Sequence, residues 1–331
     1  MAGPDAAVAS CRLAVRRTLA PVRPGSAVLV ACSGGADSLA LLSATVFEAR
    51  TRMRVIGVVV DHGLQHGSEA HTARVVEQMA GLGVDETASI RVTVDPGPHG
   101  IEAGAREARY AALTRLATHF SATLILLGHT LDDQAETVLL GLTRGSGGRS
   151  IAGMRRGFER DGVTFARPLL DITRAETEAA CVAQGIDWWR DPHNEDPRFT
   201  RSRIRHSVMP MLEDEMGPGV AAALARTADA VREDIEALDD QAEAALREAR
   251  TDGGWDCVRI VALPPALRGR VLRLAALKSG ALGSDLTREH VLALADLVSG
   301  PDPTRQIQLP GHLTAYRDGP VLRFRSTPPL G

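Results

Sequence analysis

Continuous apolar runs alternate with helix-like segments through the first half of the 331-residue chain. Residues 26–32 and 54–60 are apolar almost throughout, as strands buried on both faces of a sheet must be. Further strands are expected at 88–94 and 123–127, with helices at 37–49, 68–80, 101–118 and 132–142. Strands that alternate with helices form a parallel sheet with helices on both faces. The sequence therefore predicts an α/β fold whose ligand site lies at the carboxyl ends of the strands.

Beyond residue 140 the pattern changes. The alternation first gives way to a stretch rich in glycine and arginine, 141–162, and the cluster Gly217-Pro218-Gly219 later marks a break between elements. Helices are expected at 174–184, 201–212, 220–249, 265–278 and 287–298, and short strands at 306–309, 313–316 and 321–325. At about 150 residues per domain, we expect two domains: 1–216 with the parallel sheet, and a smaller, mainly helical domain at 217–331.

Composition excludes several classes of protein. With 44% hydrophobic and 24% charged residues, the chain can bury a core. The single lysine, Lys278, follows leucine, so a Walker A loop ending in Gly-Lys-Ser or Gly-Lys-Thr is absent. The four scattered cysteines form no Cys-x-x-Cys pair, which argues against a structural zinc site or an iron–sulfur cluster. No apolar run is long enough for a membrane span and no secretory signal is visible, so we expect a cytoplasmic protein.

The motif Ser33-Gly34-Gly35-Ala36-Asp37-Ser38 lies between the first buried strand and the following helix. Its glycines allow backbone amides to approach an anion closely, and the helix N-terminus attracts negative charge. Asp37 would repel a phosphate, but it suits a divalent cation that bridges phosphates. A tight turn with Asp37 as a helix cap is the structural alternative. We expect a phosphate-binding loop that holds Mg²⁺ through Asp37.

This motif resembles the loop of the pyrophosphate-loop (PP-loop) ATPases, the N-type adenine nucleotide alpha hydrolases. The resemblance implies an adenine nucleotide alpha hydrolase-like fold and ATP as a substrate. Enzymes of this class cleave ATP between its α and β phosphates, adenylate a carbonyl oxygen, and let a nucleophile displace AMP.

A second motif, Gly128-His129-Thr130-Leu131-Asp132-Asp133-Gln134-Ala135-Glu136-Thr137, follows the strand at 123–127. On a helix, Glu136 lies four residues from Asp132 and three from Asp133, so three acids crowd one helix start. Because this motif also follows a strand, we expect it near Asp37. A solvated, acid-capped helix N-terminus is the ordinary alternative, as is a structural, hydrogen-bonded role for His129.

Together the two motifs resemble the tRNA(Ile)-lysidine synthetase family. The resemblance covers about 26–212 and extends to Val60-Asp61-His62-Gly63-Leu64, Glu102-x-x-Ala105-Arg106-x-x-Arg109-Tyr110, Gly145-x-Gly147 through Gly153, Arg167-Pro168-Leu169-Leu170, Asp191-x-x-Asn194-x-Asp196, Phe199 and Arg201-x-Arg203-Ile204-Arg205. Ser202 departs from the pattern, because the family usually has asparagine there.

The resemblance implies a ligase that joins L-lysine to C2 of the wobble cytidine in the tRNA(Ile) with a CAU anticodon. The cytidine C2 oxygen would be adenylated with ATP and Mg²⁺, and the lysine amine would then expel AMP. The product, lysidine, would change aminoacylation from methionine to isoleucine. Residues 217–331 would contact tRNA. The sequence does not decide whether the chain forms a homodimer.

Roles carry over to matching positions only. The catalytic residues would be Asp37, His129, Asp133, Glu136 and Arg109. The nucleotide would be bound by Ser33, Gly34, Gly35, Ala36, Asp37, Ser38, Asp61 and His62, and the amino-acid substrate by Arg106, Arg109, Asp132, Asp133 and Glu136. The acids suit the lysine ammonium, and one of them or His129 would accept its proton.

Local arginine clusters supply positive charge that the net charge of −3 lacks. Residues 198–206 contain four arginines and no acid, and we expect Arg201, Arg203 and Arg205 to bind tRNA phosphates. An ordinary solvated surface is the alternative. Trp188 and Trp189 could stack a flipped base, although paired tryptophans more often belong to a core.

Three other functions stay open. A tRNA 2-thiolase would share the fold, but those enzymes generally use cysteine pairs, which are missing here. An NAD synthetase-like enzyme would share the ATP loop but not the segment 201–205 or the second domain. A binding module that senses AMP or ATP would need the loop but no acidic cluster. AMP release that depends on both lysine and tRNA would distinguish lysidine synthesis from all three.

Overall fold

The computed structural model of the protein describes residues 4–63, 67–95, 100–144, 147–191, 196–302 and 304–327. The motif residues Leu64, Gly145 and Asn194 lie outside these ranges. The chain forms two compact units, Met1–Thr143 with Gly153–Ala228, and Arg144–Ala152 with Asp229–Gly331. The units divide inside a helix, whereas the sequence places the boundary at 216/217, because the glycine–proline cluster there ends a helix without ending the unit.

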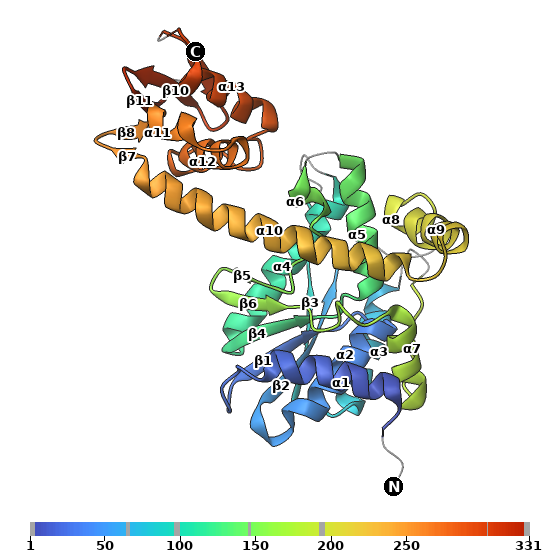
Figure 1. The fold of residues 1–331 in the computed structure, drawn as a ribbon. Helices are drawn as coiled ribbons and strands as arrows, with labels where there is room; N and C mark the ends of the chain where they lie inside the picture. Colours follow the sequence, from blue (N-terminus) through green and yellow to red (C-terminus); the bar gives the residue numbers. More distant parts are fainter. Residues whose placement is uncertain are drawn as a thin grey trace. The chain divides into compact units, whose positions relative to one another are not determined.

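The first unit contains a six-stranded sheet with the strand order β3-β2-β1-β4-β6-β5 (Figure 1). Its strands are β1 (Ala27–Ala31), β2 (Arg54–Asp61), β3 (Glu86–Arg91), β4 (Ala122–Leu127), β5 (Gly157–Arg160) and β6 (Val163–Ala166). All neighbours pair in parallel except β5, which pairs antiparallel with β6 at one edge. The predicted parallel sheet is confirmed, and β5 and β6 are strands that the sequence analysis missed.

Helices cover both faces of this sheet, as predicted. Their bounds are α1 (Ala6–Leu19), α2 (Ala36–Ala49), α3 (Ser68–Gly81), α4 (Ile101–His119), α5 (Leu131–Arg144) and α7 (Arg174–Ala183), with a 3-10 turn η1 (Arg50–Arg52). Along β1, Val28 and Val30 pack in a core with side chains of α1, α2, α3 and α7, whereas Leu29 packs in another core with side chains of α4. The alternation along β1 therefore buries both faces of the strand.

The strand order places the two sequence motifs next to each other. The order reverses at β1, which lies between β2 and β4, and such a reversal opens a crevice at the carboxyl ends of the strands. The first motif follows β1 and the second follows β4. They touch at Gly128, where an added Cβ would lie 3.1 Å from the carbonyl oxygen of Asp37.

The arginine-rich segment beyond α7 is helical from residue 200 to residue 216. It consists of α8 (Thr200–Arg203), a π-helical turn η3 (Ile204–Val208) and α9 (Met209–Met216). Ser202 and Ile204 are buried, so one side of this segment packs against the protein. The helix predicted at 201–212 is thereby confirmed.

The second unit combines helices with a five-stranded antiparallel sheet of order β7-β8-β11-β10-β9. The long helix α10 (Val220–Glu248) begins in the first unit and continues into the second. The others are α6 (Gly148–Ile151), α11 (Cys257–Ala262), α12 (Pro265–Lys278), α13 (Arg288–Ser299), β7 (Arg250–Thr251), β8 (Gly254–Asp256), β9 (Gln306–Leu309), β10 (Leu313–Asp318) and β11 (Val321–Ser326). Leu272, Leu294 and Leu322 belong to its core. Helices predominate as predicted, but β7, β8, α6 and α11 are additions.

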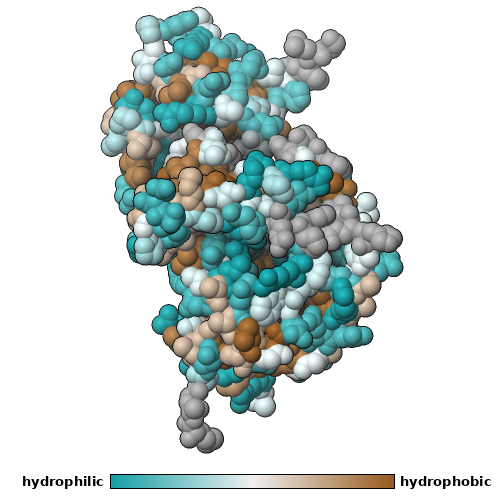
Figure 2. All heavy atoms as spheres, turned by 90° about the vertical axis from the view of Figure 1, so that its right-hand side faces the viewer, coloured by the Kyte–Doolittle hydropathy of each residue, from teal (hydrophilic) through white to brown (hydrophobic). Residues whose placement is uncertain are grey.

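In the part of the chain that the structure describes, no helix is long and apolar enough to cross a membrane. On the face drawn in Figure 2, hydrophobic residues form small patches among hydrophilic ones.

Candidate active site

The loop between β1 and α2 is closed by its own side chains. The Ser38 hydroxyl accepts from the backbone N–H of Ser33 at 3.1 Å and donates to the Gly35 carbonyl at 2.9 Å. Gly34 has φ +83°, and a Cβ there would lie 2.7 Å from Val75 Cγ2, so this position requires glycine. Gly35 caps α2 without a capping side chain, which leaves amides at the helix N-terminus for an anion.

A clamp from α3 and the segment after α7 holds this loop in place. His71 Nε2 lies 3.0 Å from the Ser33 carbonyl oxygen, and the backbone N–H of Trp189 donates to the Gly34 carbonyl at 2.9 Å. The His71 and Trp189 rings are in contact, with centroids 3.9 Å apart. Trp188 packs against the core beneath. Trp188 thus has the core contact that the structural interpretation predicts, whereas both tryptophans also line a cavity beside Asp37.

Asp37 projects from the first turn of α2 and is largely buried. Its carboxylate accepts a hydrogen bond from the Thr177 hydroxyl and lies 3.6 Å from Arg174 Nε. Burial raises the pKa of Asp37 to about 6; Thr177 and Arg174 oppose the rise, and Asp133 adds to it. Among the described residues no group of three His, Cys, Asp or Glu could hold a metal. One carboxylate beside a phosphate loop fits Mg²⁺ that is shared with substrate phosphates, rather than an all-protein site.

The three acids of the second motif have two different environments. Asp132 accepts from the backbone N–H of Arg174 at 2.7 Å, so it caps α7. Asp133 and Glu136 are buried, 8% and 1% exposed, and face arginines. Only Asp133 and Glu136 therefore form one acidic pair.

Three arginines neutralise this pair. Arg201 Nε and Arg205 Nε each donate to Glu136 at 2.7 Å. Arg174, Arg201 and Arg205 also approach one Asp133 oxygen, at 3.3, 3.1 and 3.3 Å. Burial alone would raise the pKa of Asp133, but Arg201 and Arg174 outweigh it and hold that pKa below its ordinary value. Buried carboxylates require such partners.

The three arginines assigned to tRNA point in different directions. Arg201 and Arg205 are four residues apart on one helix face and reach inward to the acids. Arg203 donates instead to the carbonyls of Pro197 and Arg198, at 2.8 and 3.0 Å. The structure thus brings Arg201 and Arg205 into the site and leaves Arg203 outside it.

A second group of cations lies on the α4 side, where the hydrogen bonds of Arg106 and Arg167 go to a tyrosine and a histidine. Arg167 donates to His129 Nδ1 at 3.2 Å and to the Tyr110 hydroxyl at 3.3 Å, which also accepts from Arg106 at 3.1 Å. No described residue pairs with the Arg109 guanidinium. Burial, together with the charges of Arg106 and Arg167, lowers the pKa of Arg109. An arginine without a counter-ion is suited to bind an anion.

Asp61, the last residue of β2, and His62 lie at the margin of this group. Asp61 accepts from its own turn, at the N–H of Gly63, 2.8 Å away, and its other oxygen lies 3.8 Å from Arg91 Nε. His62 Nδ1 is buried without a hydrogen-bond partner. Burial and the charge of Arg109 lower the pKa of His62, which disfavours the charged ring. His62 therefore has an unused polar atom, whereas Asp61 supports the turn.

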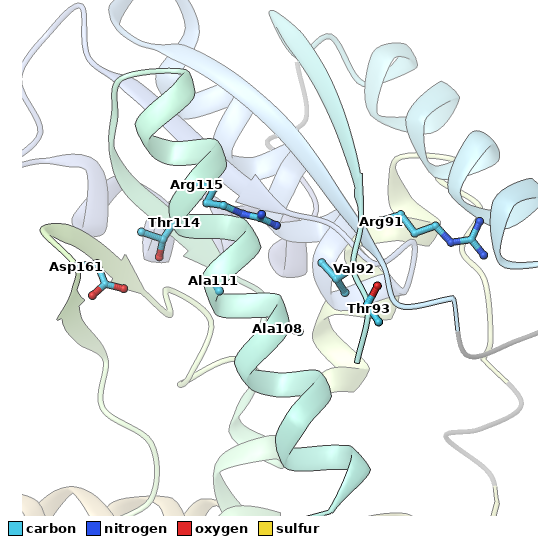
Figure 3. Close-up of a pocket in the computed structure, with 8 residues that line it drawn as sticks. All are labelled: Arg91, Val92, Thr93, Ala108, Ala111, Thr114, Arg115 and Asp161. Carbon is cyan, nitrogen blue, oxygen red and sulfur yellow. The ribbon is translucent and has the colours of Figure 1, made fainter. Parts of the chain in front are cut away.

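Two cavities can be compared. A cavity of about 370 Å³ adjoins the loop and is lined by Asp37, Arg174, Arg205 and Trp189 among others. A separate recess of about 620 Å³ lies along α4, where Ala108 and Ala111 are small (Figure 3). In that view Arg91 points away from α4 and Asp161 lies on its other side. None of the predicted site residues lines this recess.

Four residues of the site are not predicted from the sequence: Arg174, Thr177, Arg167 and His71. A signal existed for Arg174, since Thr173 and Glu176 form a capping box that fixes the start of α7. Arg167 was recognised as part of a motif but given no role. Nothing local distinguishes Thr177 or His71 from other helix residues.

The fold and the loop define a class, the ATP-using PP-loop domains. Residues 10–212 match the family model described as PP-loop domain. The U34-tRNA thiolase NcsA from Methanococcus maripaludis has a similar fold, with a TM-score of 0.58 and 18% identity over 69% of this chain and 80% of that one.

Full-length relatives narrow this class. The chain is 47% identical to the tRNA(Ile)-lysidine synthase of Streptomyces coelicolor, over 98% of this chain and 99% of that protein. It is also 47% identical to the enzyme of the same name from Thermobifida fusca, over 97% and 99%. Residues 256–327 match the model described as TilS substrate binding domain. The chain belongs to the tRNA(Ile)-lysidine synthase family, whose members are tRNA-modifying ligases that use ATP.

Proposed function

We propose that the protein joins L-lysine to C2 of the wobble cytidine of the CAU-anticodon tRNA(Ile), through an adenylated cytidine, and so changes aminoacylation from methionine to isoleucine. One observation carries the proposal: the PP-loop lies beside two groups of side chains that can bind different charges. Arg109 has no acidic partner among the described residues, whereas Asp133 and Glu136 are buried acids whose partners in the free protein are arginines. The first group suits the anionic ATP, and the second suits the lysine ammonium once it replaces an arginine.

The first half-reaction depends on the phosphate side. A cytosine carbonyl is a poor electrophile, so its oxygen must be activated. The loop amides and the N-terminus of α2 stabilise the charge that leaves with pyrophosphate. Arg109, with Arg106, binds the phosphate that remains or the substrate carboxylate. Asp37 would hold Mg²⁺, which supplies further charge neutralisation when bound.

The second half-reaction depends on Asp133 and Glu136. Their carboxylates attract the lysine ammonium, but in the free protein Arg201 and Arg205 occupy them. We therefore assign these two arginines an exchange: they turn to tRNA phosphates, and the lysine ammonium takes their place. The buried carboxylates stay neutralised throughout, so the exchange never leaves a buried charge unpaired. Asp132 acts indirectly, by holding α7 and Arg174 in place.

Binding of tRNA is assigned to Arg201, Arg203 and Arg205 together with residues 217–331.

Cys32 precedes the loop, but burial raises the pKa of its thiol, so it is not prepared as a thiolase nucleophile.

The test is AMP release from labelled ATP, with tRNA and lysine added singly and together. AMP release that requires both tRNA and lysine, with label retained on the tRNA when lysine is omitted, supports the proposal. AMP formation from ATP, ammonia and a carboxylate substrate such as nicotinic acid adenine dinucleotide, without tRNA, would favour an NAD synthetase-like reaction instead.

A further inference from the structure

The contact between Arg167 and His129 restricts what this histidine can do. Arg167 Nε donates to His129 Nδ1 at 3.2 Å. A guanidinium has only donors and stays protonated, so Nδ1 must be the acceptor. The ring proton of a neutral His129 is then on Nε2.

Arg167 cannot easily leave this position. It is 5% exposed, and its other nitrogens donate to the Arg155 carbonyl at 2.5 Å and to the Tyr110 hydroxyl at 3.3 Å. Its guanidinium also lies 4.8 Å from the centre of the Phe158 ring. Side chain, ring and backbone partners from three parts of the unit thus aim its Nε at His129.

The surroundings of His129 also disfavour the imidazolium. Arg167, Arg109 and Arg201 face the ring, and Asp133 is the acid that opposes them. Burial, followed by these three charges, lowers the pKa of His129 to about 3, although Asp133 acts against the shift. The ring is therefore neutral at physiological pH.

The Nε2 side of the ring has no hydrogen-bond partner among the described residues, and His129 is half-buried. His129 directly follows Gly128, whose backbone touches Asp37 and Ser38 of the PP-loop. The residue that carries the free N–H therefore directly follows the point where the second motif packs against the PP-loop.

We infer that Arg167 is a positioning residue that keeps His129 in the Nε2–H form, and that His129 donates a hydrogen bond to a reacting oxygen rather than accepting the lysine proton. The inference rests on the proposed function for the identity of that oxygen, a phosphate or the cytidine O2. It leaves Asp133 and Glu136 as the proton acceptors. A neutral imidazole that donates can stabilise charge developing in a transition state.

The direct test is ¹H–¹⁵N long-range NMR of the ¹⁵N-histidine-labelled full chain, with the His129 signals assigned by their loss in His129→Gln. We expect the Nε2–H tautomer and no titration between pH 5.5 and 8.5. In Arg167→Met the tautomers should mix, while Arg167→Lys, which keeps a donor, should retain part of the preference. Titration near pH 6.5, or an Nδ1–H form in the unmodified protein, would overturn the inference.

Kinetics give a second, independent readout. The amide of glutamine can donate from near the Nε2 position, whereas that of asparagine corresponds to Nδ1. We expect the single-turnover rate of adenylation to be at least ten-fold higher in His129→Gln than in His129→Asn or His129→Ala. In steady-state assays of the full reaction, the KM for lysine should be unchanged. Equal losses in all three variants would contradict the donor role. If the unmodified protein adenylates no tRNA but shows the expected NMR form, the proposed function fails and the tautomer assignment stands.

Discussion

Asp37→Asn should make the ligand-free protein more stable and inactive at the same time. The carboxylate is 23% exposed, and its burial raises the pKa from 3.8 to about 6. A shift of about two units, at about 1.4 kcal/mol each, means that the charged form costs the fold up to about 3 kcal/mol at neutral pH. Asparagine removes the charge and keeps an oxygen that accepts from Thr177.

The sign follows from proton binding. Between about pH 4 and 6 the folded state holds a proton on Asp37 that the unfolded state has released, so stability falls as pH rises through this window. The advantage of Asp37→Asn should be near zero at pH 4 and reach its full value at pH 7 and above. The same variant should form no AMP, because the proposed Mg²⁺ ligand is gone.

The assay is urea unfolding at several pH values in EDTA, followed by tryptophan fluorescence, to which Trp188 and Trp189 contribute in the first unit. Asp171→Asn is the matched control. In the unmodified protein, hydrogen bonds from Arg156 lower the pKa of Asp171, so loss of the Asp171 charge should destabilise the protein above about pH 4. Equal stability of Asp37→Asn and the unmodified protein at pH 7.5 would refute the reasoning.

Three further predictions follow from the site. Glu136→Gln should slow lysine attack more than adenylation in single-turnover assays with labelled lysine and ATP, and equal slowing would place this acid at the nucleotide instead. In an Asp133→Asn/Glu136→Gln background, which leaves no buried carboxylate unpaired, replacing Arg201, Arg203 and Arg205 by alanine should weaken tRNA binding and flatten its salt dependence while ATP still binds, whereas unchanged tRNA affinity at moderate salt would make the cluster a structural one. His71→Ala should raise the KM for ATP about ten-fold by loosening the loop, a loss of roughly one hydrogen bond, and an unchanged KM would mean that the clamp is dispensable.

Much of the first unit could be predicted because its strands are buried on both faces. Such strands leave apolar runs, as at β1 and β2, and the loops that follow them carry the motifs. The strands β5 and β6 have four residues each; β5 lies inside the glycine- and arginine-rich stretch 141–162 and β6 directly follows it, so no apolar run revealed them. Helix α1 was not predicted either. Its sequence does carry a helix pattern, because the buried residues Val8, Cys11, Val15 and Leu19 are spaced for one helix face.

The chemistry of the site was only partly accessible. The two motifs could be placed together, since carboxyl ends of neighbouring parallel strands meet. The pairing of Glu136 with Arg201 and Arg205 could not be predicted, because these residues are 65 and 69 positions apart in the sequence. An arginine in sequence looks the same whether it faces water or a buried acid. The same holds for Arg167, whose role depends on the His129 ring.

The most direct test of the central claim is mass spectrometry of nucleosides from CAU-anticodon tRNA(Ile) incubated with the protein, ATP, Mg²⁺ and lysine. We predict that the wobble cytidine gains the mass of lysine less one water, that the gain requires both ATP and lysine, and that Asp37→Asn abolishes it. An unmodified wobble cytidine, or a sulfur-containing product at that position, would contradict the account.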